Sequence, residues 1–171
     1  MIRIVKKICL LGDFAVGKTS LVRRFVYNLF RDDYLSTIGV KVSRKTVVVP
    51  CDDELVELTM MLWDLAGSEE FDRVRASYLR GASGALLVCD LTRPDTLASL
   101  RAYADALLSV NPGVRFAVAA NKRDLVDQQR LTSEQVEDLA ASLEAPYHLT
   151  SAKTGDEVDA LFRRLCRVLL T

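Results

Sequence analysis

The segment Gly12-Asp13-Phe14-Ala15-Val16-Gly17-Lys18-Thr19 lies between an apolar run, residues 4–11, and an amphipathic one, residues 21–27. It has the form G-x-x-x-x-G-K-[ST], and its flanks predict a strand before it and a helix after it. In such a loop, successive backbone N–H groups and the helix dipole face one spot and attract an anion. We therefore expect a phosphate site, with Lys18 at the β- and γ-phosphates of a nucleotide and Thr19 on Mg²⁺.

Length and composition favour one soluble domain that spans residues 1–171. Half of the residues are hydrophobic, the formal net charge is zero, and no apolar run is long enough to cross a membrane. A zero net charge argues against nucleic acid or an anionic membrane surface as the main partner. The N-terminus lacks a signal-peptide pattern, and Cys166 is too far from the end for a prenylation box, so membrane attachment has no support in this sequence.

The four cysteines, Cys9, Cys51, Cys89 and Cys166, show no metal-binding spacing. Three of them, Cys9, Cys89 and Cys166, lie in apolar stretches and are expected to be buried thiols. Reduced, buried thiols are typical of a cytoplasmic protein, and we expect that location.

The rest of the chain alternates between strand and helix patterns. Residues 40–49 and 55–63 predict two strands joined as a hairpin, and therefore an antiparallel pair. Further strands are expected at residues 85–90, 115–120 and 146–149, and helices at residues 95–110, 132–143 and 156–170. Thr132 and Gln135 have the spacing of a capping box at the start of the second of these helices. Such alternation predicts an α/β fold with a mainly parallel sheet, helices on both faces and ligands at the carboxyl ends of the strands.

Asp64 follows the second of these strands, within Trp63-Asp64-Leu65-Ala66-Gly67. This is the position of a carboxylate that holds Mg²⁺ through water, and Gly67, without a Cβ, would let its N–H approach the γ-phosphate. On its own, Asp-x-x-Gly is equally typical of a turn. The phosphate loop upstream favours the functional interpretation.

Two polar segments, Asn121-Lys122-Arg123-Asp124 and Ser151-Ala152-Lys153, each follow a predicted strand. The Asp124 carboxylate can accept from N1 and N2 of guanine, whereas adenine offers it no donor there. Asn121 would tie its loop to the base and to the phosphate loop, and the Lys122 stem would cover one face of the base. The Ala152 N–H would meet guanine O6. Together these segments predict guanine recognition.

These motifs resemble those of the Ras-superfamily small GTPases, and most of all the Rab branch, over essentially the whole chain. The similarity is carried by residues 36–40, 63–71 and 77–82. It implies a P-loop NTPase G domain with a six-stranded, mostly parallel sheet, one antiparallel strand and five flanking helices. It also implies a switch that binds GTP or GDP with Mg²⁺ and hydrolyses GTP. Effectors, exchange factors and GTPase activators are then expected to recognise the loops at residues 30–40 and 64–80.

The resemblance also assigns residues. Thr37 is expected at Mg²⁺ and the γ-phosphate in the GTP state, and Phe30 at the edge of guanine, although Phe30 could instead be a core residue. The expected metal set is Thr19, Thr37 and Asp64, and the expected catalytic set is Lys18, Thr37, Gly67 and Ser68. The expected nucleotide-binding set is Asp13, Phe14, Ala15, Val16, Gly17, Lys18, Thr19, Ser20, Phe30, Tyr34, Thr37, Gly67, Asn121, Lys122, Asp124, Leu125, Ser151, Ala152 and Lys153.

Two departures from the family pattern lie at the expected γ-phosphate position. Ser68 stands where the family usually has a glutamine that orients the attacking water, and a hydroxyl cannot offer the paired donor and acceptor of a carboxamide. Phe14 replaces a small residue beside Ala15, where a glycine is common, and its ring could occupy the space of an arginine finger. Both changes affect the rate of hydrolysis rather than nucleotide binding, so we expect slow intrinsic GTP hydrolysis.

Three alternatives remain open on the sequence. Glu69, Arg73 or Arg75 could replace the missing glutamine. The chain could be an interaction scaffold that holds its nucleotide with negligible turnover. It could also be a phosphate-loop kinase or ATPase.

Overall fold

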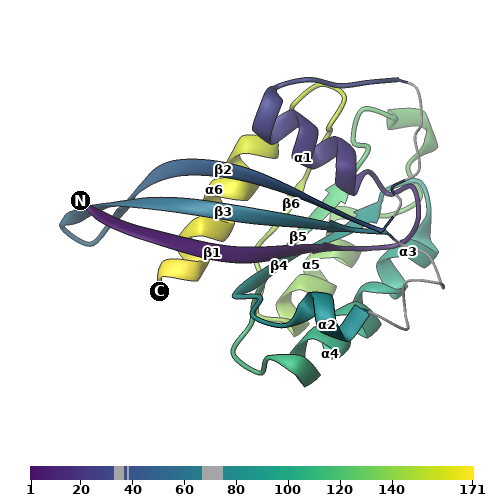
Figure 1. The fold of residues 1–171 in the computed structure, drawn as a ribbon. Coiled ribbons are helices and arrows are strands. Elements are labelled where there is room, and N and C mark those ends of the chain that lie inside the picture. The colour runs from purple at the N-terminus through teal and green to yellow at the C-terminus, as the bar shows by residue number, and fades with distance from the viewer. Residues whose placement is uncertain (33–36, 38, 67–74) are drawn as a thin grey trace.

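Six strands form one sheet in a computed structural model, which describes residues 1–32, 37, 39–66 and 75–171 (Figure 1). The sheet has the order β2-β3-β1-β4-β5-β6. The strands are β1 (Ile2–Leu11), β2 (Val40–Cys51), β3 (Glu54–Leu65), β4 (Gly84–Asp90), β5 (Arg115–Asn121) and β6 (Tyr147–Leu149). All neighbouring pairs are parallel except β2 and β3, which form the predicted antiparallel hairpin.

The helices follow the predicted alternation. They are α1 (Lys18–Tyr27), α2 (Arg75–Leu79), α3 (Pro94–Ala98), α4 (Leu100–Val110), α5 (Ser133–Ser142) and α6 (Val158–Leu170), with a 3₁₀ turn, η2, at Val126–Gln128. Ser99 separates α3 from α4 but keeps helical dihedrals, and its N–H donates to the Asp95 carbonyl over 3.1 Å. The two therefore correspond to the single helix expected at residues 95–110. Counted in this way, five α-helices flank the sheet within the described residues, and the expected α/β fold is confirmed.

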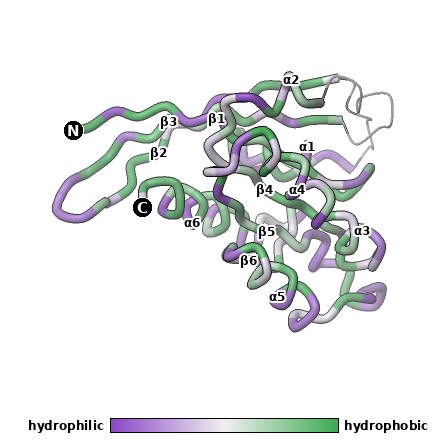
Figure 2. The backbone as a smooth tube through the Cα atoms, turned by 90° about the horizontal axis from the view of Figure 1, so that it is seen from below, coloured by the Kyte–Doolittle hydropathy of each residue, from purple (hydrophilic) through white to green (hydrophobic). Residues whose placement is uncertain are grey.

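Two hydrophobic cores cover the two faces of the sheet. One lies between the sheet and the helices α1 and α6, and the stacked rings of Phe25 and Phe162, 4.1 Å apart at their centroids, join these helices. The other core lies under α2, α3, α4 and α5. Cys9, Cys89 and Cys166 are buried in these cores, as expected. Figure 2 shows the hydropathy along the backbone, with an apolar β4 at the centre of the sheet and a hydrophilic turn between β2 and β3.

The carboxyl ends of the five mutually parallel strands point to one edge of the sheet. β1 leads there into the phosphate loop and β3 into residue 66, while β5 and β6 lead into the segments around residues 121–125 and 150–157. This shared direction brings together segments that are more than a hundred residues apart in the sequence (Figure 1). Among the described residues, no helix is long and apolar enough to cross a membrane.

Candidate guanine-nucleotide site

The phosphate loop is shaped by glycines and by its lysine. A Cβ built on Gly17, whose φ is +103°, would lie 2.3 Å from Asn121 Nδ2, so a larger residue would strain the backbone and displace the Asn121 side chain. The Lys18 ammonium is buried, and it donates to the carbonyls of Gly12 (2.8 Å) and Asp13 (3.1 Å). Burial lowers the pKa of Lys18, with nearby Asp64 and Asp13 acting in the opposite direction. A buried cation of this kind favours an anionic ligand beside it.

Helix α1 begins at this loop with its N-terminus open. Within the described residues, no side chain caps it and its first turn contains no acidic residue. The first N–H groups of a helix have no partner inside the helix and carry its positive dipole. This end of α1 is therefore suited to hold phosphate groups.

Thr19, Thr37 and Asp64 meet beside the loop. The two hydroxyl groups lie 2.6 Å apart, and Thr19 also donates to Asp64 Oδ2. Asp64 is 2% exposed, and its other oxygen, Oδ1, is buried and lacks a hydrogen-bond partner among the described residues. Burial raises the pKa of Asp64, while the Thr19 hydrogen bond and the charge of Lys18 act against it. An unsatisfied carboxylate oxygen beside two hydroxyls is a donor set that fits Mg²⁺, a hard cation with oxygen ligands.

Two loops at the ends of β5 and β6 are joined by side-chain hydrogen bonds. Asn121 Nδ2 donates to the Val16 carbonyl over 3.0 Å, which ties β5 to the phosphate loop. Asn121 Oδ1 accepts from the Thr150 hydroxyl (3.1 Å) and from the Ala152 N–H (3.2 Å). The Ser151 hydroxyl donates to Asp124 Oδ1 over 2.7 Å. The carboxylate and the N–H expected to contact guanine are therefore held on one hydrogen-bonded platform.

A buried carboxylate at the end of β4, Asp90, links this platform to the phosphate loop. Its side chain is 1% exposed and lies 2.9 Å from Lys122 Nζ and 3.1 Å from Arg93 Nε. Burial alone would raise the pKa of Asp90, but hydrogen bonds from Thr92 and Lys122 outweigh it and hold the pKa below its usual value. Arg93 Nη2 in turn donates to the Phe14 carbonyl over 2.8 Å.

One pocket of about 560 Å³ is bordered by the phosphate loop, by α1 and by the segments that follow β5 and β6, whereas Asp64 and Asp90 do not line it. Its lining residues are Phe14, Ala15, Gly17, Lys18, Thr19, Ser20, Arg23, Phe30, Arg31, Asp32, Thr37, Lys41, Leu65, Ala66, Asn121, Lys122, Asp124, Leu125, Ala152 and Lys153. Most of the expected nucleotide-binding set is among them. Phe30 both lines the pocket and packs against the core under α1, so each interpretation of this residue has support.

Some expected residues lie elsewhere. Asp13, Val16 and Ser151 do not line the pocket, and the Asp13 carboxylate accepts from the hydroxyls of Ser99 (2.7 Å) and Tyr103 (3.0 Å) instead. Tyr34, Gly67 and Ser68 are outside the described residues, as are Glu69 and Arg73; for Arg75 only the backbone is described.

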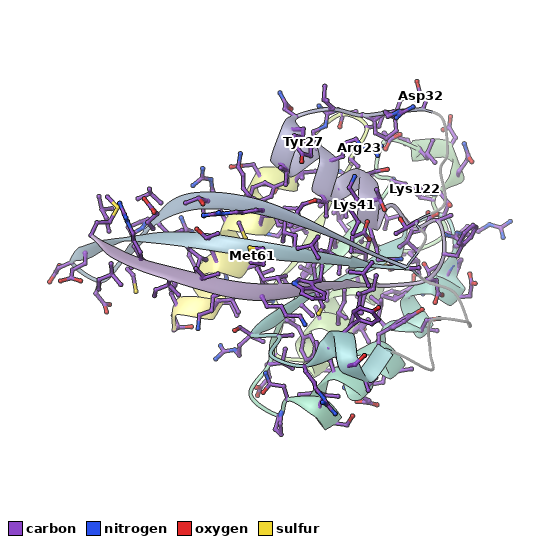
Figure 3. All side chains as sticks on the ribbon, viewed as in Figure 1. Arg23, Tyr27, Asp32, Lys41, Met61 and Lys122 are labelled. Carbon is purple, nitrogen blue, oxygen red and sulfur yellow. The ribbon has the colours of Figure 1, made fainter. Side chains whose placement is uncertain are left out.

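The expected nucleotide-binding set left out three cations at the pocket wall, Arg23, Arg31 and Lys41. Arg23 of α1 and Lys41 of β2 line the same side of the pocket, near the carboxyl end of β3 (Figure 3). Arg23 stands one helical turn after Thr19, a spacing that could have indicated it. Lys41 lies directly opposite Asp64 in the β2–β3 ladder, which only the strand register reveals.

Comparisons with known proteins agree with this geometry. A model of the Ras family matches residues 7–171. The Ras-related protein Rab-31 of Homo sapiens is 36% identical over 162 residues, which cover 94% of this chain and 81% of that protein. The Ras-related protein Rab-22A of Homo sapiens and that of Mus musculus match to the same extent. The chain therefore belongs to the Ras family. Within that family it is Rab-like, a small GTPase that binds guanine nucleotide and works as a molecular switch.

Proposed function

We propose that this GTPase is a switch with slow intrinsic hydrolysis, and that the pocket at the carboxyl edge of the sheet holds its guanine nucleotide and Mg²⁺. The observation that carries the proposal is the convergence on one pocket of three parts: the phosphate loop, the Thr19–Thr37–Asp64 corner and the platform of Asn121 and Asp124. A nucleotide needs these three parts together, for its phosphates, its metal ion and its base.

In this proposal the phosphates lie between the phosphate loop and the start of α1. Lys18 releases its two loop carbonyls and turns its charge to the β- and γ-phosphates. Thr19 and Thr37 hold Mg²⁺ directly, and Asp64 holds it through water. The ion, when bound, offsets the negative charge of the phosphates. The unpartnered Oδ1 of Asp64 supports this assignment, since a metal-bound water would satisfy it.

The base occupies the other end of the pocket. Asp124 accepts from N1 and N2 of guanine, and the Ala152 N–H donates to O6. The stem of Lys122 and the ring of Phe30 lie along the base. All four residues line the pocket, which supports this placement. The remaining pocket-lining members of the expected set, among them Ala15, Gly17, Ser20, Leu125 and Lys153, complete the contacts.

Slow hydrolysis is the finer part of the proposal. Phe14 is 52% exposed and lines the pocket, and in this proposal its ring takes up space that an arginine from an activator needs. Ser68 is too short to orient a water as a glutamine does. Phosphoryl transfer depends on positioning and on charge stabilisation, so both features lower the rate and leave binding intact. The GTP form is then long-lived, and effectors, exchange factors and activators recognise it through the loops at residues 30–40 and 64–80.

Single-turnover GTP hydrolysis tests this proposal. Wild type is compared with Ser68→Gln, with Phe14→Gly and with the double variant, each loaded with GTP and Mg²⁺. We expect slow wild-type hydrolysis that at least one substitution accelerates about tenfold or more. A fast wild type that neither change affects would contradict the proposal and favour a substitute such as Glu69. Negligible turnover of tightly bound GTP in every variant, with or without cell extract, would instead favour the scaffold alternative.

A further inference from the structure

Arg24, on the last turn of α1, binds the loop that follows β6. Its Nε donates to the Ala152 carbonyl over 2.9 Å and its Nη2 to the Lys153 carbonyl over 2.6 Å. Its Nη1 donates to Oδ1 of Asn28, the residue that caps the C-terminus of α1, over 3.2 Å. One guanidinium therefore joins the end of α1 to a loop more than 120 residues later in the chain.

The contact between Arg24 and the two carbonyls requires the geometry of an arginine. Two neighbouring carbonyls accept from two nitrogens of one planar group, whereas a lysine ammonium is a point charge without this fixed fork. Gly155 of the same loop faces the stem of Arg24: a Cβ built on it, at φ +86°, would lie 3.5 Å from Arg24 Cδ. Arg24 therefore holds the backbone of this loop through two carbonyls, and its stem lies beside Gly155.

The held loop is the one that presents the base-reading groups. The Ala152 N–H, which the proposed function assigns to O6, donates to Asn121 Oδ1 in this structure, and Ser151 orients Asp124 by donating to Oδ1. Helix α1 is itself fixed, because Phe25 stacks on Phe162 of α6 with an interplanar angle of 4°. The first residues of α1, Lys18 and Thr19, belong to the phosphate site. The same rigid helix therefore sets the distance between the phosphate end and the base end of the pocket.

We propose that Arg24 is a positioning residue for guanine recognition, which holds the Ala152 carbonyl so that the adjoining loop N–H meets O6 of the base. This inference rests on the proposed placement of guanine at Asp124 and Ala152. Arg24 itself does not line the pocket, so it acts through the backbone of the loop and not by touching the nucleotide.

The test compares wild type with Arg24→Lys and Arg24→Gln. Three probes are used: GDP, IDP and the diphosphate of 2-aminopurine riboside. GDP and IDP both carry O6, while the 2-aminopurine ring has no oxygen at that position. Equilibrium affinities are measured with Mg²⁺, and thermal melting reports whether each variant is folded. Arg163→Gln is the matched control. Arg163 lies on α6, where its Nε donates to the exposed carboxylate of Asp159 over 2.7 Å.

We expect Arg24→Lys and Arg24→Gln to lose about tenfold in affinity for GDP and IDP, the effect of one weakened hydrogen bond to the base, and much less for the 2-aminopurine probe. Arg163→Gln should leave all three affinities as in wild type. Equal losses for the three probes would overturn the inference, because they indicate a general loosening of the pocket. So would unchanged affinities in folded Arg24 variants. A wild type that binds none of the probes would instead refute the proposed function.

Discussion

Arg93 anchors the phosphate loop to the end of β4 through the carbonyl of Phe14, 2.8 Å from Nη2. The same guanidinium lies 3.1 Å from Asp90, whose other cationic partner is Lys122. The phosphate end and the base end of the pocket therefore share one buried carboxylate.

Replacing Arg93 by alanine should loosen the phosphate loop. We expect GDP to dissociate about fivefold faster, the factor that corresponds to ~1 kcal/mol for a charged hydrogen bond that is partly open to solvent. Release of a fluorescent GDP analogue in the presence of Mg²⁺ measures the effect. Arg101→Ala, on the exposed face of α4, is the control. A release rate equal to that of wild type would show that the contact does not restrain the loop.

The architecture could be predicted well from the sequence, because the spacing of hydrophobic residues indicates which face of each helix or strand is buried. The six strands, the hairpin and the capping box of Thr132 and Gln135 are all found in the structure. The ends of the elements were less accurate. The last helix begins at Val158, two residues later than expected, because Glu157 adopts a left-handed conformation at φ +61°. α2 was not predicted, since its five residues are too short for a helical period to emerge.

The long-range contacts that hold the loops of the site in place could not be predicted from the sequence, for a different reason. Arg24 contacts a loop 128 residues away, and Arg93 contacts one 79 residues away. No local pattern encodes such pairs, because they depend on how α1, β4 and β6 are packed. The motifs predicted most of the residues that line the pocket, but not Arg23 and Lys41. Nor did they predict that Asp13 turns its carboxylate away to Ser99 and Tyr103.

Asp90→Asn should reduce stability in a pH-dependent manner. The pKa of Asp90 in the folded protein lies below its usual value of 3.8, so the folded state favours the ionised form. Its stabilisation is complete above the unfolded-state pKa and is lost as the pH falls through the folded-state pKa. We expect the variant to be about 2 kcal/mol less stable at pH 7 and this deficit to be clearly smaller near pH 3, below the unfolded-state pKa. Urea unfolding at both pH values measures this.

The control for that measurement is Asp138→Asn, an exposed carboxylate on α5. It should change the free energy of unfolding by less than about 0.5 kcal/mol at either pH. A deficit of Asp90→Asn that stays constant from pH 7 to pH 3 would indicate a packing effect instead of a charge effect.

The substitution Asp64→Asn should weaken Mg²⁺ binding without reducing the stability of the fold. The carboxylate is buried with one unsatisfied oxygen, so a neutral amide should leave the nucleotide-free protein as stable as wild type to within about 1 kcal/mol. The increase in GDP affinity that Mg²⁺ produces should fall about tenfold or more, because the charged group that holds the ion through water is lost. Titration of GDP with Mg²⁺ or with EDTA gives this difference. A variant that keeps the full effect of Mg²⁺ would rule out a role for Asp64 in holding the ion.

The most direct test of the guanine site is the nucleotide preference of Asp124→Asn. An asparagine can donate to the O2 of xanthine and no longer accepts two N–H bonds from guanine. We expect GDP affinity to fall about a hundredfold and XDP to become the preferred diphosphate in direct competition with Mg²⁺ present. Retained preference for GDP in the folded variant, or no affinity of the wild type for GDP, would contradict the account of the site.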